Sequence, residues 1–381
     1  MLARMSRGQS SRTAEIMSIE ILLNREAEWL MGGGPDAKIV VSSRVRFARN
    51  VRGFVFPGRA DIETRTKVRK LIEDSLERSM LMQGSLSVRL DELGELDRQF
   101  LVERHLISRE HARGDEGSAL VIDDKEIMSL MVNEEDHLRL QILRSGFQLK
   151  EALAEINEMD DEIEKSVEYA FLPTVGYLTS CPTNVGTGMR ASVMLHLPGL
   201  VLANQINQVV QAIAKLGLAV RGLYGEGTEA SGNLFQISNQ VTLGVAEKDI
   251  LENLEKVINQ IVEHEKKAQQ ALFKKNFKAL EDRVCRAYGM LTSARIISSK
   301  ETIDLLSALK LGIDFHIVDI DLGTINELFI VTQPAHLQKL AGRELKPEER
   351  DIVRADLIRT RLEERGRKKF QIPNPKSQNG D

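Results

Sequence analysis

The sequence has 381 residues, of which 42% are hydrophobic, so the chain is long enough to form two domains with separate cores. Its 52 basic and 56 acidic residues leave a net charge of −4, and no apolar run reaches the length of a bilayer-spanning helix, so we expect direct contact with neither nucleic acid nor a membrane. The two cysteines, Cys181 and Cys285, are too few for a disulfide framework, which favours the reducing cytoplasm.

The amino-terminal part of the chain predicts an extension followed by a mixed domain. Residues 1–17 are basic and polar but lack the apolar run of a secretory signal, so we expect them to be disordered. Residues 18–246 form short β-branched runs, often without a helix between them, which is typical of an α+β fold. Helical periodicity appears at 61–82, 137–159 and 199–216. The strands of a largely antiparallel sheet flanked by helices are predicted at 38–45, 119–123, 127–133, 175–180, 218–223, 233–238 and 241–244.

The second half of the chain predicts helices only. Residues 247–290 are almost free of glycine and proline and carry an apolar stripe, which predicts one long helix. We expect residues 247–367 to form an all-helical regulatory and dimerisation domain, whose last helix begins at Pro347 and ends at Gly366. The polar tail 368–381 is expected to be disordered.

Two arginines alternate in the segment SSRVR, residues 42–46. Because side chains alternate along a strand, Arg44 and Arg46 share one face, and both guanidinium groups can reach a single polyanion. The alternative is an edge strand whose charged side chains are simply solvated.

The segment NEEDHLR, residues 133–139, follows the apolar run IMSLMV. Glu134 and Glu135 are therefore expected at the end of a strand, where functional residues collect, and Arg139 one turn into a following helix. The alternative is an ordinary helix start, with Asn133 as its cap and the two acids accepting from backbone donors.

Two glycine-containing loops also carry arginines. In CPTNVGTGMRASV, residues 181–193, the loop leads through Arg190 into an apolar segment; the alternative is a tight structural loop with an ordinary buried cysteine. In RGLYGEGTE, residues 221–229, Arg221 and Glu226 flank glycines whose backbone can approach phosphate. The sequence contains neither a Walker A loop nor the HRD and DFG elements of ordinary protein kinases.

The order SxRxR, NEEDHLR, CPTN-G-T, RASV and RGxxGE resembles the catalytic domain of the phosphagen (ATP:guanido) kinases, over about residues 39–244. CPTNVGT is the most specific of these elements. Within this family the bacterial protein-arginine kinases are most similar, because they also share the helical carboxyl-terminal region and the motif RDIVRA. The resemblance implies ATP-dependent phosphorylation of a guanidinium group, with Mg²⁺ held through the nucleotide and no metal ligands from the protein.

The resemblance also implies roles for individual residues. A guanidinium group has a pKa above 12, so it needs carboxylates that hold it and accept its proton. Glu135 matches the base, Glu226 matches the carboxylate that aligns the guanidinium, and the Cys181 thiolate supports its charge. The arginines match a triphosphate clamp, and His105 matches a nucleotide-contacting histidine. The residues expected to bind ATP are Ser42, Ser43, Arg44, Val45, Arg46, His105, Arg139, Arg190, Ala191, Ser192, Val193, Met194, Arg221, Gly222, Leu223, Tyr224 and Gly225.

The expected substrate is an arginine side chain of a protein, including those of the enzyme itself. Small-molecule phosphagen kinases carry a helical domain ahead of SxRxR that encloses a free metabolite, whereas only 41 residues precede Ser42 here. An open pocket admits an arginine that is still part of a polypeptide. The alternatives are a kinase for free arginine or another small guanidino compound, and a non-catalytic adaptor.

The motif RDIVRA places Arg350 and Arg354 four residues apart on one helix face. By resemblance this motif, with Asp351 and Ala355, forms an allosteric pocket for phosphoarginine; the alternative is a solvated face on which Asp351 pairs with the arginines. The resemblance further implies protein clients, an activator protein, a Clp-type protease that degrades marked clients in a stress response, and a homodimer.

Overall fold

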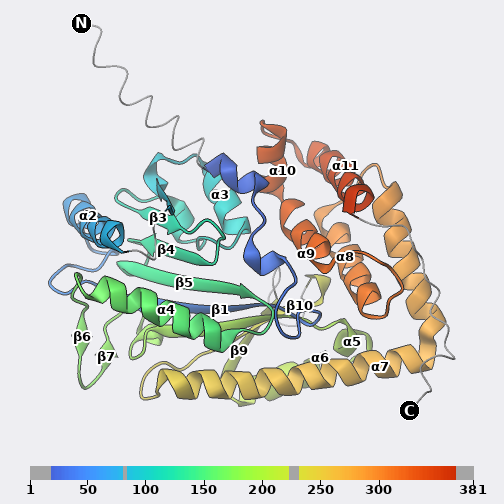
Figure 1. The fold of residues 1–381 in the computed structure, drawn as a ribbon, viewed down its shortest axis with the longest axis horizontal. Helices are drawn as coiled ribbons and strands as arrows, with labels where there is room; N and C mark the ends of the chain where they lie inside the picture. The colour runs from blue at the N-terminus through green and yellow to red at the C-terminus, as the bar shows by residue number, and fades with distance from the viewer. Residues whose placement is uncertain (1–18, 80–83, 223–230, 366–381) are drawn as a thin grey trace, which may run out of the picture.

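A computed structural model describes residues 19–79, 84–222 and 231–365. Within them, eight antiparallel strands form one sheet in the order β2-β3-β4-β5-β1-β8-β10-β9, and β6 and β7 form a separate hairpin (Figure 1). The strands are β1 (Val40–Arg49), β2 (Leu86–Arg89), β3 (Ala119–Ile122), β4 (Met128–Val132), β5 (Leu138–Ser145), β6 (Phe171–Leu172), β7 (Gly176–Tyr177), β8 (Met189–His196), β9 (Leu218–Gly222) and β10 (Leu234–Asn239). The prediction of a largely antiparallel sheet flanked by helices is confirmed.

The two faces of the sheet differ because side chains alternate along each strand. On one face, apolar residues such as Val45, Phe47 and Val193 are buried beneath α4 (Leu149–Glu164) and the first half of α7 (Glu247–Ser293). The other face is polar over the middle of the sheet. At the end of the strands this polar face gives way to Leu143, Met194 and Leu234, which pack in the core of the carboxyl-terminal helices.

Those carboxyl-terminal helices gather beyond one end of the strands (Figure 1). They are α8 (Ser299–Asp314), α9 (Leu322–Val331), α10 (Pro334–Ala341) and α11 (Pro347–Arg365).

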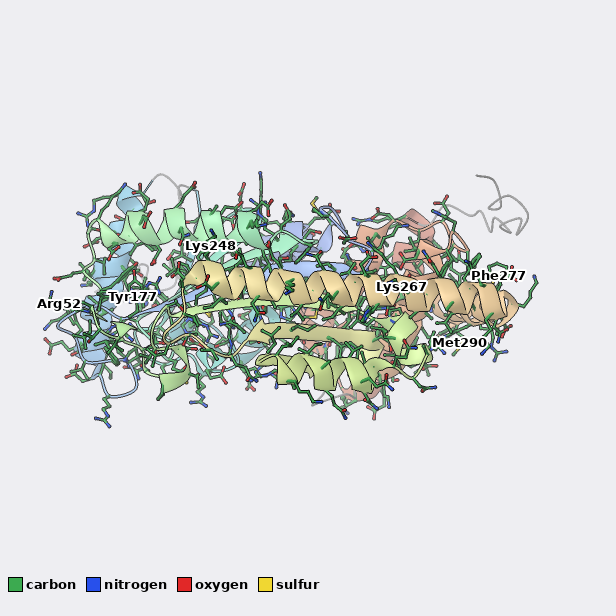
Figure 2. The ribbon with its side chains drawn as sticks, turned by 90° about the horizontal axis from the view of Figure 1, so that it is seen from below. Arg52, Tyr177, Lys248, Lys267, Phe277 and Met290 are labelled. Carbon is green, nitrogen blue, oxygen red and sulfur yellow. The ribbon has the colours of Figure 1, made fainter. Side chains whose placement is uncertain are left out.

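Helix α7 joins the two cores. Its buried residues as far as Ala268 belong to the core of the sheet, and those from Leu280 onward belong to the core of the carboxyl-terminal helices. Between them, Asn276 has non-helical backbone angles. Figure 2 shows α7 running along the molecule, from Lys248 to Phe277 near the right-hand end, with Arg52 and Tyr177 beyond the start of the helix at the left. The expected domain boundary after residue 246 stays a prediction.

Two helices that pack near the sheet were predicted from the sequence with approximately correct bounds. The predicted helix 61–82 corresponds to α2 (Ile62–Arg78), which is capped by the Asp61 carboxylate accepting from the backbone N–H of Thr64 at 2.8 Å. The long helix predicted at 247–290 corresponds to α7. The expected extension 1–17, the tail 368–381 and the helix stop at Gly366 lie outside the described residues.

The predicted helix 137–159 is wrong in its first half, where the chain forms strand β5. Leu138, Leu140 and Ile142 are fully buried on one face, so the apolar period of this segment is two residues rather than 3.6. Gly146, with φ of +66°, then turns the chain into α4.

Three further predictions are corrected. The strand at 175–180 is reduced to Gly176–Tyr177, and 241–244 is irregular because the Thr242 hydroxyl bonds to carbonyl oxygens of the loop that follows Cys181. The helix at 199–216 is two helices, α5 (Pro198–Leu202) and α6 (Ile206–Lys215), which are separated by Asn204 with φ of +56°. Sequence reasoning also missed β8, although it is a central strand of the sheet.

One buried ion pair fixes the end of β1. The Arg49 guanidinium bonds to the Asp160 carboxylate at 2.7 and 3.0 Å, donates to the Thr187 carbonyl at 2.9 Å, and lies 3.6 Å from the centroid of the Tyr177 ring. The two side chains of the pair are only 1% and 8% exposed. Removing one partner would leave an uncompensated buried charge.

We therefore predict that Asp160→Ala lowers the free energy of unfolding by about 3–5 kcal/mol. Glu168→Ala is the matched control, because it removes the partner of Arg52 in an ion pair whose side chains are 68% and 70% exposed, and it is expected to cost less than about 1 kcal/mol. Urea unfolding followed by circular dichroism measures both values. Equal decreases in the free energy of unfolding for the two variants would contradict a stabilising role for the buried Arg49–Asp160 pair.

Candidate active site

Five arginines lie on the polar face of the sheet. On neighbouring strands, Arg46 is directly opposite Arg190, Arg139 is opposite Ala48, and Arg221 is opposite Gln236. Cross-strand partners point to the same face, so the strand register brings these side chains together. We call this set the arginine face; its members are Arg44 and Arg46 on β1, Arg139 on β5, Arg190 on β8 and Arg221 on β9.

Burial and like charge both disfavour the charged forms of Arg44 and Arg46. Burial, together with the charges of Arg139 and Arg190, lowers the pKa of Arg44 to about 10. Burial and the neighbouring arginines also lower the pKa of Arg46 well below its ordinary value. Arg44 is held in place by hydrogen bonds from its Nη2 to Gln236 Oε1 at 2.9 Å and from its Nε to Ser192 Oγ at 3.3 Å. A polyanion bound here would relieve the repulsion.

Two adjacent glutamates, in the turn between β4 and β5, have opposite protonation tendencies. Burial raises the pKa of Glu134, but its ion pair with Arg139 and a hydrogen bond from Ser108 more than offset this and lower the pKa to about 2. Partial burial and the charges of Asp136 and Glu134 raise the pKa of Glu135. Glu134 is therefore a fixed anion, whereas Glu135 is an exposed carboxylate that takes a proton more readily.

The expectation that both glutamates lie at a strand end is confirmed, but Arg139 lies on strand β5 and not in a helix. The alternative that Asn133 caps a helix is wrong for the same reason. Asn133 has φ of +55°, and its side-chain nitrogen donates to the carbonyls of Arg65 and Gly117 at 2.8 and 2.9 Å. Its role is to hold the turn.

The loop that follows the β6–β7 hairpin is attached to the glutamate turn. Ser180 donates from its hydroxyl to the Glu135 carbonyl at 2.7 Å and from its backbone N–H to Asp136 at 2.6 Å. The next residue, Cys181, is a free cysteine whose sulfur lies 3.0 Å from the Thr183 hydroxyl. Burial and the charges of Arg221 and Arg139 lower the pKa of Arg190, and a negative charge on Cys181 would oppose this shift.

The same loop requires glycine at residue 186. Gly186 has φ of +110°, and a Cβ there would lie 2.3 Å from the carbonyl oxygen of Thr242. The loop therefore packs more closely against the chain after β10 than any side chain would allow.

His105 borders the arginine face from the side of α3 (Glu95–Glu103). With Arg44, Ser192 and Gln236, it lines a small cavity on this face of the sheet. Burial and the charge of Arg44 lower the pKa of His105 to about 3, so the imidazole is neutral. Its ring also makes an edge contact with Trp29, at 5.3 Å between centroids.

The remaining residues expected to bind ATP divide between the two faces. Ser42, Ser192 and Met194 share the face of the arginines. Ser43, Val45, Ala191 and Val193 point the other way, and the Ser43 hydroxyl donates to the Gly146 carbonyl at 2.8 Å. Gly222 ends β9 opposite Phe235. Leu223, Tyr224, Gly225 and Glu226 lie outside the described residues.

Sequence reasoning missed three polar side chains of the arginine face or its border: Ser108, Gln141 and Gln236. Gln141 is opposite Arg46 in the strand register and donates to the His105 carbonyl at 2.8 Å. The signal that could have found Gln141 was the two-residue alternation of β5, which was interpreted as a helix.

The residues of the RDIVRA motif lie on α11, in the carboxyl-terminal helices. Arg354 is only 2% exposed, and it donates to the carbonyls of Thr332 and Ile297 at 2.9 Å each and to Asp351 at 2.5 Å. Ala355 is buried in the helical core, and Arg350 is half-buried. The structure thus places one of the two motif arginines in a fully packed setting.

Over the described part of the chain, no group of three or more histidine, cysteine, aspartate or glutamate side chains could hold a metal ion. No helix in these same residues is both long and apolar enough to cross a bilayer.

The buried charge of Arg46 should affect both the stability of the fold and the affinity for Mg-ADP. Because the pKa of Arg46 is lower in the folded chain than in the unfolded chain, where the group is charged at neutral pH, burying that charge opposes folding at neutral pH. We therefore predict that Arg46→Met raises the melting temperature and weakens Mg-ADP binding by about tenfold or more, since charge-assisted hydrogen bonds are lost. Differential scanning fluorimetry and calorimetry measure these effects. Arg283→Met, on the exposed side of α7, should change neither, and a lower melting temperature for Arg46→Met would contradict the account.

Comparisons with known proteins agree with this geometry. Residues 67–268 match the family "ATP:guanido phosphotransferase, C-terminal catalytic domain", and residues 277–374 match "Protein-arginine kinase McsB C-terminal domain". Proteins named "Protein-arginine kinase" are similar along most of the chain. The relative from Halothermothrix orenii is 49% identical over 91% of this chain and 99% of its own length, and that from Pelotomaculum thermopropionicum is 50% identical over 89% and 97%.

Solved structures also match. The duplicated taurocyamine kinase from Schistosoma mansoni, with bound transition-state analogue components, has a TM-score of 0.55 and 31% identity, over 61% of this chain and 34% of that chain. A lombricine kinase, at 24% identity and a TM-score of 0.55 over 62% of this chain and 68% of its own, supports the fold. The chain therefore belongs to the ATP:guanido phosphotransferase family, and it is a phosphotransferase similar along nearly its whole length to protein-arginine kinases.

Proposed function

We propose that the chain transfers the γ-phosphoryl group of ATP to the guanidinium groups of arginine residues in proteins, its own included. The observation that carries this proposal is the arginine face, which lies beside the exposed carboxylate of Glu135. The substrate class is supported by relatives at about 49% identity that are named for it, and by the match of the helical region to the McsB carboxyl-terminal domain.

In this proposal, the arginine face binds the triphosphate and offsets the charge that develops during phosphoryl transfer. Mg²⁺ arrives with ATP, held by phosphate oxygens and water, which are the ligands that this hard cation prefers. His105 closes the nucleotide site from the side of α3. The planar guanidinium groups of the face can each donate two hydrogen bonds to phosphate oxygens.

The acceptor guanidinium docks between Glu135, Glu226 and Cys181. A guanidinium nitrogen attacks the γ-phosphorus, the bond from that phosphorus to the bridging oxygen breaks, and ADP leaves with the electron pair of that bond. Glu135 accepts the proton that the nitrogen loses, a role that suits its raised pKa. Glu226 aligns the guanidinium with the bond that breaks, and the Cys181 thiolate stabilises its positive charge.

The wider role that we propose rests on the family resemblance. Phosphoarginine marks clients for a Clp-type protease in a stress response, an activator protein stimulates the kinase, and the enzyme acts in the cytoplasm. A homodimer is supported by exposed apolar side chains in the helical region, namely Met290, Ile296 and Ile352. Degradation assays with phosphorylated and unphosphorylated clients test the marking role, and light scattering tests the dimer.

We also propose that the RDIVRA motif binds phosphoarginine as an allosteric effector. Because the Arg354 guanidinium is already bonded to two carbonyls and to Asp351, half-buried Arg350 is the group that supplies free donors to a phosphoryl group. Equal activation of wild type and Arg350→Ala by added phosphoarginine would rule this pocket out.

The substrate class has a direct test. After incubation with Mg-ATP and an arginine-rich protein, we expect mass spectrometry to find acid-labile phosphate on arginine residues. The Glu135→Gln variant keeps the shape of the side chain but cannot act as the base, so it should give at least about a hundredfold less product. Transfer to free L-arginine alone would favour the small-molecule kinase instead. Nucleotide binding with no transfer to any guanidino compound would favour the adaptor.

A further inference from the structure

One carboxylate joins the catalytic sheet to the carboxyl-terminal helices. Glu103, the last residue of α3, accepts hydrogen bonds from the backbone N–H groups of Ala335 and His336 at 2.8 and 3.0 Å, at the start of α10. The same carboxylate lies 2.8 Å from Nδ1 of His336. Helices α3 and α10 lie side by side (Figure 1), although these residues are more than 230 positions apart in the sequence.

The position of the Glu103 carboxylate at the start of α10 is favourable. The N-terminal end of a helix carries partial positive charge and unpaired N–H groups, so an anion there is favourable. The His336 side chain is 1% exposed, and its ring lies 4.5 Å from that of Phe100 between centroids. A second tie joins the same two helices, because Lys339 on α10 pairs with Asp97 on α3 at 2.7 Å.

Two residues after Glu103, His105 adopts a backbone conformation that is uncommon for its residue type. Its φ of +61° lies in the left-handed region, which persists only when the surroundings hold it. The buried Arg104, between the two, pairs with Glu126 at 2.9 Å, and Gln141 donates to the His105 carbonyl at 2.8 Å. The orientation of His105 toward Arg44 therefore depends on where α3 ends.

The residues just before α10 also contact the RDIVRA motif. Helix α10 begins directly after the end of α9, and there the Thr332 carbonyl accepts from Nε of Arg354 at 2.9 Å. The short turn between α9 and α10 is thus held on one side by Glu103 and on the other by Arg354. A displacement of Arg354 would move the backbone to which Glu103 is bonded.

We propose that Glu103 is a positioning residue for the nucleotide site. Through the end of α3 it holds His105 against the arginine face, so the placement of the carboxyl-terminal helices sets the affinity for nucleotide. The turn between α9 and α10 is then the path by which a ligand bound at Arg350, on the same helix as Arg354, changes that affinity. The inference rests on the proposed function in two respects, since it takes the arginine face as the nucleotide site and the RDIVRA motif as a ligand site.

The test is a double-mutant cycle on the full-length chain, with Mg-ADP affinity measured by calorimetry. Glu103→Ala is expected to raise the Kd for Mg-ADP by about 5- to 150-fold, the usual range of coupling between sites. In the His105→Ala background, the same substitution should change the Kd by less than about twofold, because the residue through which it acts is gone. Glu103→Gln, which keeps the size of the side chain, replaces Glu103→Ala should the latter fail to fold.

Asp97→Ala is the matched control, because it removes the other tie between α3 and α10 without touching the His105 segment. It should leave the Kd within about twofold of wild type, even where it lowers the melting temperature as much as Glu103→Ala. The inference is overturned if Glu103→Ala leaves the Kd unchanged in a folded protein, or raises it by the same factor in both backgrounds.

Failure of the inference is distinct from failure of the proposed function, because Mg-ADP binding does not require a guanidino substrate. If the double-mutant cycle gives the expected Kd values but protein arginine is not phosphorylated, the role of Glu103 stands and the proposed substrate class is rejected. Absence of Mg-ADP binding to the wild-type chain would reject both.

Discussion

The burial of like-charged guanidinium groups on one face of the sheet is the constraint on which the rest of the structure depends. Side chains of like charge are brought onto one face only because β5, β1, β8, β10 and β9 are locked in register, with an apolar core on the opposite side. Burial, together with the charges of neighbouring arginines, lowers the pKa values of Arg44 and Arg46. A face that gathers these charges is suited to a polyanion, and a triphosphate would offset them.

Two neighbouring acids have different roles in the site. Glu134 and Glu135 are adjacent in sequence, yet the turn between β4 and β5 directs one to Arg139 and leaves the other exposed. Their pKa values therefore shift in opposite directions. Pairs of titratable groups whose surroundings drive their pKa values apart are typical of sites that move protons. Asp136, bonded to Asn50 and Ser180, completes the turn and keeps Glu135 in place.

The sequence predicted the parts of the site that follow from local backbone geometry or from family motifs. Arg44 and Arg46 share a face because strands alternate, and the family resemblance supplied Arg139, Arg190 and Arg221. The helix expected at 137–159 was wrong in its first half because the two-residue alternation of Leu138, Leu140 and Ile142 was interpreted as helical. Strand β8 was missed because residues 189–193 were interpreted as the end of a glycine-containing loop. The bond from α10 to Glu103 has no local signal at all, since its partners are more than 230 residues apart. Glu226, which the resemblance makes the second carboxylate, lies outside the described residues.

The central claim is that a guanidinium group docks against Glu135 while phosphate oxygens lie on the arginine face. A crystal structure with Mg-ADP, nitrate in place of the transferring phosphoryl group, and an arginine-containing peptide measures this directly. We expect the Glu135 carboxylate within about 2.6–3.2 Å of a guanidinium nitrogen, and the β-phosphate and nitrate in contact with the arginines of β1, β5 and β8. A guanidinium bound away from Glu135, or phosphates bound off the arginine face, would contradict the account.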